Sequence, residues 1–358
     1  MTENSTLSSR REFLFLYDIK MGNPNGDPDE NRPRILPDGT FYVTDVRLKR
    51  FIRDYLKMQT YEREGKSYPY EILVDTIEGK TTNLTGRVAE YLKSKGRKEC
   101  QGKELVDILL DAFIDARLFG SSFAFKGKES EETEAPQKGA EENPDDDNKR
   151  GKGKGKPDKW EPKPEPKTLT GPVQIHHGEV LHQAQEVDIH GTCIFGSQEG
   201  KTQGTFTSSF VLRYALIGFS GVANEHSAKI SRLSDVDYEV FLKAIWNSVR
   251  ASGNTRSKSG QVPRLLVNVD YKPGVEFQYG RLSEYVKLVS ASSKPEKEWN
   301  SPADYRVDLA LLAQRLDAQK EKIDRISFSI SPDVQLEKPI PADWKNMEIG
   351  RASCRERV

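Results

Sequence analysis

Cysteine is scarce in this chain, with three residues among 358. Cys100, Cys193 and Cys354 are widely spaced, which fits neither a disulfide framework nor a cysteine-based metal site, so we expect a reducing compartment. The N-terminus is polar and lacks the apolar core of a signal peptide. No apolar run approaches the roughly 18 residues of a membrane span. We therefore expect a soluble, cytoplasmic protein without a membrane partner.

An excess of either charge is also lacking, because lysine plus arginine and aspartate plus glutamate both number 55. The net charge therefore excludes no class of partner, and only the distribution of charge is informative. Basic residues gather over 47–57 and again over 250–264. Local clusters of this kind attract polyanions whatever the total charge is.

Large apolar side chains are almost absent from residues 126–168, where Trp160 is the exception. The segment cannot bury enough apolar area to offset its ordering entropy, so we predict a low-complexity, disordered insertion. The folded part is then a single interrupted domain over 10–125 and 169–345. Residues 348–358 have no apolar period and resemble translated sequencing-adaptor sequence, so we expect a non-native tail.

The rest of the sequence predicts an α+β fold. Apolar spacing predicts helices beginning near residue 45 and over 104–117, 236–250 and 303–320. Short apolar or alternating runs predict strands over 12–20, 171–175, 263–269 and 323–330, and a long hairpin whose strands run over 187–195 and 205–215 around a turn at 196–204. This order fits a ferredoxin-like or RRM-like sheet with helices on one face.

The most informative segment is the loop after the first apolar run. Residues 22–34 read Gly-Asn-Pro-Asn-Gly-Asp-Pro-Asp-Glu-Asn-Arg-Pro-Arg. Proline fixes φ, glycine permits positive φ, and asparagine and aspartate bond back to the local backbone. A long loop of this composition at the end of a strand is typical of a functional segment.

A strongly basic helix follows this loop. Its polar face carries Arg47, Lys49, Arg50, Arg53 and Lys57. For a lone helix, the simpler interpretation is a solvated surface. The preceding loop offers backbone N–H donors, and residues 250–258 add a second cationic loop rich in glycine and serine. Together they indicate a groove that follows a nucleic-acid backbone.

Four histidines lie within 15 residues, at His176, His177, His182 and His190. Their spacing matches no known metal-ligand set, and on a strand the first two would face opposite ways. We therefore predict no metal site, and favour His176 as a residue that stacks on or hydrogen-bonds to a base or sugar.

Other enzymatic signatures are weak. Residues 196–202 resemble a phosphate-binding loop, but Phe195 stands where glycine is needed and a strand follows, so we reject a nucleotide hydrolase. The loop acids Asp27, Asp29, Glu30 and Asp38 could hold a metal or activate a hydroxyl, although such residues more often form local turns. No catalytic triad can be argued.

Several motifs resemble a known family. Residues 22–29, Arg32-Pro33-Arg34 and 43–50 are similar to the backbone subunits of type I CRISPR Cascade complexes, the Cas7 superfamily, in a branch like subtype I-B and close to I-C. Further similar segments are 115–120, 169–174 and 214–220. The resemblance covers about residues 11–272 apart from the insertion.

This resemblance implies an RRM-like palm with an inserted finger region and a thumb hairpin at about 180–213. It implies a non-catalytic subunit that polymerises head-to-tail along a crRNA guide and presents it for pairing with target DNA. The implied partners are the guide, target DNA, further copies of the chain and other Cascade subunits. No cofactor is expected.

The guide-binding region of the family matches the loop and the start of the basic helix. With the other candidate cations and His176, the predicted RNA-binding residues are Asn23, Asn25, Gly26, Arg47, Lys49, Arg50, Arg53, Arg117, His176, Arg250, Arg256 and Lys258. Two alternatives remain. Asp27 or Asp29 could serve a metal-dependent endonuclease that cuts target RNA, as in type III relatives, or the chain could bind any single strand.

Overall fold

The computed structural model describes residues 6–63, 65–76, 83–97, 100, 102–122, 168–192, 206–253, 255–347 and 349. The predicted insertion at 126–168 lies outside these residues except for its last residue, Thr168. The predicted tail lies outside them except for Ile349, which packs against the main hydrophobic cluster.

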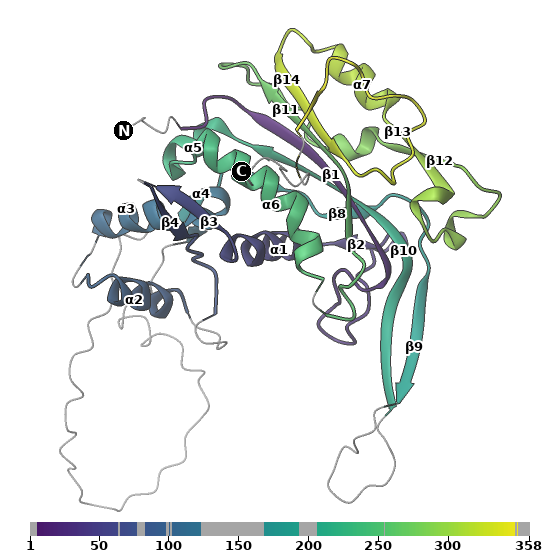
Figure 1. Ribbon diagram of the computed structural model, residues 1–358, viewed down its shortest axis with the longest axis horizontal. Coiled ribbons are helices and arrows are strands. Elements are labelled where there is room, and N and C mark those ends of the chain that lie inside the picture. The colour runs from purple at the N-terminus through teal and green to yellow at the C-terminus, as the bar shows by residue number, and fades with distance from the viewer. Residues whose placement is uncertain are drawn as a thin grey trace, which may run out of the picture.

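A mixed sheet forms the centre of the molecule (Figure 1). Its middle strand, β1 (Arg11–Gly22), pairs antiparallel with β10 (Phe206–Ala223) on one side and with β11 (Val262–Tyr271) on the other. Beyond β11 lie β14 (Ile323–Ile330) and, parallel to it, β15 (Lys345–Asn346). Beyond β10 lie β8 (Gly178–Val180) and β2 (Tyr42–Val43). Two more strands, β7 (Val173–Ile175) and β9 (Glu186–Thr192), also pair with β10.

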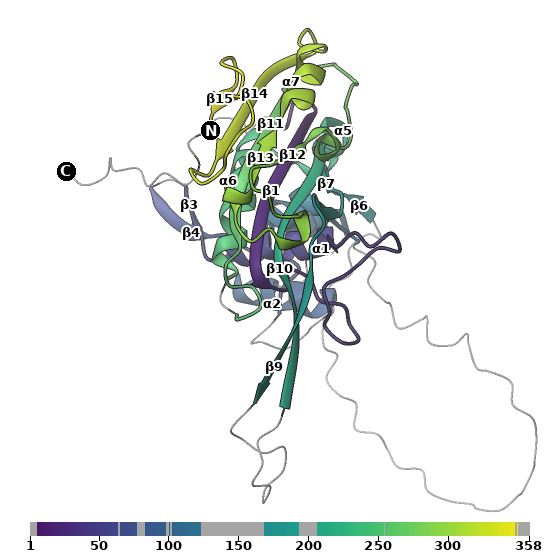
Figure 2. The same ribbon diagram turned by 90° about the vertical axis from the view of Figure 1, so that its right-hand side faces the viewer.

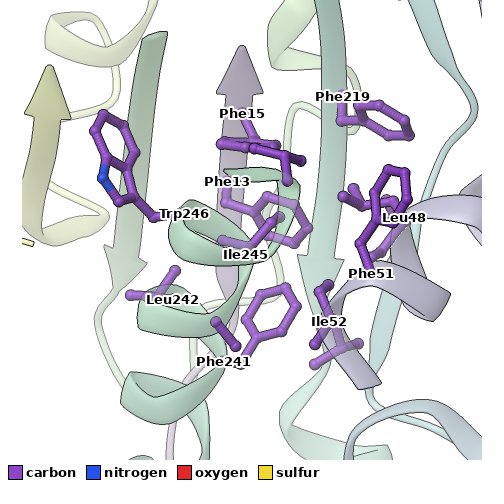
Figure 3. Packing of buried hydrophobic residues seen from close by; sticks show 14 of the residues in the cluster. Phe13, Phe15, Leu48, Phe51, Ile52, Phe219, Phe241, Leu242, Ile245 and Trp246 are labelled. Carbon is purple, nitrogen blue, oxygen red and sulfur yellow. The ribbon is translucent and has the colours of Figure 1, made fainter. Parts of the chain in front are cut away.

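Two helices cover one face of this sheet. They are α1 (Asp45–Lys57) and α6 (Asp235–Ala251), which pack against each other, and α6 also packs against β1. Thr44 caps α1 and Ser234 closes a capping box on α6. Figure 3 shows the apolar stripes of both helices meeting the aromatic side chains of β1 and β10.

The opposite face is also covered, which differs from the expectation of helices on one face only. Its layer comprises η2 (Leu282–Tyr285), β12 (Lys287–Ser290), η3 (Glu296–Glu298), η4 (Pro302–Asp304), β13 (Tyr305–Asp308) and α7 (Ala310–Asp317). A second cluster, including Leu14, Leu16 and Trp299, fills the space beneath it. Burial on both faces explains why β1 reads as a continuous apolar run.

The helix predicted over 303–320 was therefore wrong in its first half. Tyr305 and Val307 are buried and alternate with half-buried Arg306 and Asp308, so this part pairs as β13 with β12. The single helix predicted over 104–117 was also wrong. It is divided into α3 (Gly102–Ala112) and α4 (Ile114–Phe119) by Phe113, whose backbone is extended and whose ring is buried in a third cluster.

This third cluster belongs to a lobe at the C-terminal end of α1. The lobe contains β3 (Thr60–Arg63), β4 (Lys66–Pro69), α2 (Leu84–Ser94), β5 (Gly120–Ser122) and β6 (Thr168–Thr170), beside α5 (Glu225–Ser231). Ser122 pairs with Thr168, so the residues that flank 123–167 are neighbours.

No helix among the described residues is both long and apolar enough to span a bilayer.

Candidate nucleic-acid interface

The end of β1, the start of α1 and the loop after α6 meet at one place. The backbone N–H of Asn23 donates to the Ser257 carbonyl at 2.8 Å, and the Lys258 ammonium donates to the Asn23 carbonyl. A Cβ on Gly22 would lie 2.8 Å from the same Ser257 carbonyl, so this close approach requires glycine. We call residues 22–26, Arg47, Ser257 and Lys258 the cradle.

The cradle holds two half-buried cations for which no described residue supplies a counterion. Arg47 makes no ion pair with any residue that the structure describes, and its guanidinium lies 5.6 Å from the Phe51 ring. Burial and, secondarily, the positive charge of Arg47 lower the pKa of Lys258 to about 8. Two uncompensated cations that repel each other favour occupation of the site by an anion.

Asn25 and Gly26 shape the cradle. The Asn25 Oδ1 atom accepts from the Thr44 backbone N–H at 2.9 Å and from its hydroxyl at 2.8 Å. Thr44 in turn accepts from the Arg47 N–H, so Asn25 fixes the start of α1 and with it the position of Arg47. A Cβ on Gly26 would lie 1.9 Å from Asn31 Oδ1 and 3.2 Å from the Asn31 Cα, so a side chain here would displace the Asn31 side chain and crowd its backbone.

The buried Asn23 side chain bonds across the first loop. Its Nδ2 donates to the Asn31 carbonyl at 2.6 Å, and Asn31 adopts a positive φ of 55°. Its Oδ1 is buried without a hydrogen-bond partner among the described residues. These contacts give the first loop a defined shape between β1 and α1.

Four predicted cations instead have carboxylate partners. Lys49 pairs with Asp45 at 3.0 Å, and Arg50 pairs with Asp54 at 2.9 Å. Arg53 pairs at 2.9 Å with Asp115, a buried residue from α4. Arg117 forms two hydrogen bonds to Asp237 on α6, at 2.7 and 3.0 Å, and also donates to carbonyls at the end of α3.

The structure separates His176 from the cradle. His176 and His177 follow the end of β7, so the strand alternation expected of them does not apply, and His177 lies 3.4 Å from Asp45 at the start of α1. His176 lies near Arg281, and burial followed by that positive charge lowers its pKa. Arg250 and Arg256 are exposed, and Arg256 adjoins Ser257 of the cradle. Among the described residues, no group of three or more histidine, cysteine, aspartate or glutamate side chains could hold a metal ion.

Two arginines of the first loop, Arg32 and Arg34, make contacts within the protein that the sequence did not predict. Arg34 has a buried Nε without a partner among the described residues, close to Asn25 in the backbone. Arg32 stacks on Phe210 with its guanidinium carbon 3.7 Å from the ring centroid. The Arg-Pro-Arg triplet marks both as loop cations, but nothing in the sequence identifies Phe210 as a partner.

The predicted hairpin forms an arm that projects from the sheet (Figures 1 and 2). Seven residue pairs join β9 to the first part of β10, from Phe206↔Thr192 to Leu212↔Glu186. Its tip, over 193–205, lies outside the described residues. The arm begins beside the first loop, so the cradle and the arm lie on the same side of the molecule.

Comparison with known proteins gives three findings. A family model described as CRISPR-associated protein Cas7 matches residues 9–310. A protein of that name from Haloferax volcanii is 29% identical over 331 residues, covering 90% of this chain and 86% of its own. A chain from a CRISPR RNA-guided surveillance complex has a TM-score of 0.44 and 10% identity, covering 94% of both chains. A second such chain, from a pre-nicking complex, has a TM-score of 0.47 and 10% identity, covering 94% of this chain and 96% of that one.

Proposed function

The chain belongs to the Cas7 family of CRISPR-associated proteins, and from this we propose that it is a crRNA-binding backbone subunit of a Cascade-type complex. The observation that carries this proposal within the molecule is the pair of cations Arg47 and Lys258, which have no carboxylate partner in the part of the chain that the structure describes and lie beside the backbone of the first loop. Such a site binds phosphate without reading bases, which leaves the bases free to pair with a target.

In this proposal the fold is an RRM-like palm. The strand order β11-β1-β10-β8, with α1 after β1 and α6 between β10 and β11 on the same face, supports it. The lobe built on residues 59–122 and 168–170 serves as the finger region, and the arm within 180–213 serves as the thumb. Residues 126–168 are an insertion in the finger region.

The proposed assembly is a head-to-tail filament of copies along one guide, with other Cascade subunits and target DNA as further partners. A heterologous interface that does not close generates such a filament. We assign the complex to type I, in a branch like subtype I-B, on the first-loop motif. We place it in the cytoplasm, where guide RNA is available.

The test is to purify the chain from cells and sequence the RNA that accompanies it, then to measure binding of guide-length RNA to the wild type and to the Arg47→Ala/Lys258→Ala variant. We expect bound guide transcripts and a clear loss of affinity in the variant. A wild-type protein that carries no RNA and ignores it in vitro would overturn the function. Equal affinity for every RNA, without complexes of defined length, would favour a general single-strand binder.

We propose that the subunit is non-catalytic. Asp27 Oδ1 accepts backbone N–H groups of Asp29 and Glu30 at 3.2 and 2.9 Å, which is the geometry of a turn. Incubation of the assembled particle with complementary RNA and Mg²⁺ should leave the RNA intact. Regularly spaced cuts that disappear in Asp27→Ala would establish the endonuclease instead.

A further inference from the structure

Arg32 joins the first loop to the base of the β9–β10 arm. Its guanidinium lies over the Phe210 ring at 3.7 Å and donates to Glu186 Oε1 at 2.7 Å, while its Nε donates to Glu30 Oε2 at 2.6 Å. Glu186 begins β9 and Phe210 belongs to the arm part of β10. One side chain therefore contacts both strands of the arm.

The arm needs such an anchor because the sheet supports it only at its base. β1 ends where Gly22 pairs with Leu212, and from Leu212 to Phe206 the partner of β10 is β9. A two-stranded ribbon is marginally stable and free to twist and bend. Its direction therefore depends on side-chain contacts at its base.

Backbone contacts connect Arg32 to the cradle. The Asp27 N–H donates to the Arg32 carbonyl at 2.8 Å, and Asn23 Nδ2 donates to the carbonyl of the preceding residue, Asn31, at 2.6 Å. Asn23 itself accepts from Lys258. A short, closed loop thus runs from Arg47 and Lys258 to the side chain that holds the arm.

We propose that Arg32 is a positioning residue that fixes the arm at one angle to the cradle. This inference deepens the proposed function and rests on it. With the arm fixed, an RNA strand seated on Arg47 and Lys258 meets the arm at a set distance along its backbone. Lysine cannot replace Arg32, because only the planar guanidinium can stack on Phe210 and donate to Glu186 at the same time.

The test measures the arm directly in the full chain without RNA. Spin labels are placed at Ser208→Cys on the arm and Lys243→Cys on α6, both exposed sites, after the three native cysteines are changed to serine. In Arg32→Ala we expect the population outside the wild-type distance range to rise roughly tenfold, the effect of losing one exposed cation–π contact and its ion pairs. Phe210→Leu should broaden the distribution similarly, and Arg32→Lys should not restore it.

A matched control separates positioning from general destabilisation. Arg306 makes a similar exposed pair with Glu337 at 2.6 Å, far from the arm in the sequence, and Arg306→Ala should leave the distances unchanged. The melting temperatures of Arg32→Ala and of the wild type should agree. A distance distribution in Arg32→Ala identical to that of the wild type would overturn the proposal.

RNA binding gives a second measurement. Arg32→Ala should keep wild-type affinity for a short RNA that occupies one subunit, and should lose cooperativity on an RNA long enough for several. Unchanged cooperativity would overturn the role in spacing the strand. If the wild type binds no RNA while the arm still broadens in Arg32→Ala, the proposed function fails and the anchoring of the arm by Arg32 stands.

Discussion

The two ends of α1 carry the same kind of charge in opposite circumstances. At the N-terminal end, Arg47 is half-buried beside Lys258, with no carboxylate partner among the described residues. Two turns later, Arg53 is held by Asp115, which is 1% exposed and also accepts the Leu73 and Val74 N–H groups at 2.7 and 3.2 Å. In the proposed function the first end receives an anion from outside, whereas the second has an anion supplied by the chain itself.

This difference separates binding from stability along one helix. A cation without a partner costs folding free energy that an incoming phosphate can recover, so its removal should weaken binding. A cation paired with a buried carboxylate fastens α1 to the lobe that contains α4, so breaking the pair should unfold that junction. Mutations at the two ends should therefore have distinct signatures.

The largest effect is expected at the paired end. Asp115→Ala leaves Arg53 half-buried and uncompensated and leaves two backbone N–H groups without their acceptor. Removing one partner of a buried pair costs about 3 to 5 kcal/mol of unfolding free energy. Urea denaturation measures this loss. The control is Asp54→Ala, which removes the partner of Arg50 in an exposed pair. A loss below 1 kcal/mol would erase the contrast between the two ends.

The next effect concerns RNA at the unpaired end. Arg47→Ala/Lys258→Ala should lower affinity roughly 20-fold near 0.1 M salt and reduce the salt slope by about 1.4, the amount for two phosphate contacts on a single strand. The unfolding free energy of this variant should not fall by as much as in Asp115→Ala, because the substitution removes a repulsion between two like charges. Filter binding across salt concentrations measures the slope. An unchanged slope would show that these cations do not lie on phosphates.

Lys258 makes the binding depend on pH. Its pKa of about 8 means that the free protein loses this charge as pH rises through 8, whereas phosphate favours the charged form. Affinity for RNA should therefore fall between pH 7 and 9. In the same free protein, unfolding free energy should rise from about pH 8 towards the ordinary lysine pKa near 10.4, because the unfolded chain binds the extra proton there. Lys258→Arg should remove both dependences, and persistence of either in that variant would assign it to another group.

The smallest effect belongs to the middle of the helix. Arg50 and Asp54 form an i,i+4 pair in which both side chains are about two-fifths exposed (43% and 42%). Arg50→Ala should change unfolding free energy by about 0.5 kcal/mol or less. It should also alter the RNA salt slope less than Arg47→Ala does. A larger effect on RNA than that of Arg47→Ala would move the interface along the helix and away from the cradle.

Local patterns identified much of this fold. The helices α1 and α6 and the strands β1, β11 and β14 follow from short-range spacing. The same reasoning failed at Phe113 and at Tyr305, where burial in a distant cluster overrides helix propensity. The short strands β2, β6 and β8 have no recognisable sequence pattern, because they form only by pairing with strands that are distant in the sequence.

The sequence by itself determined the basic face of α1, the shape-forming residues of the first loop and the family resemblance, since each depends on neighbours along the chain. Only the tertiary structure decided which basic residues are free. Asp115 and Asp237 reach Arg53 and Arg117 across 62 and 120 positions, while Lys258 reaches Asn23 across 235. A charge is defined by the residue that carries it, but its availability to a ligand depends on what folding places within hydrogen-bonding distance.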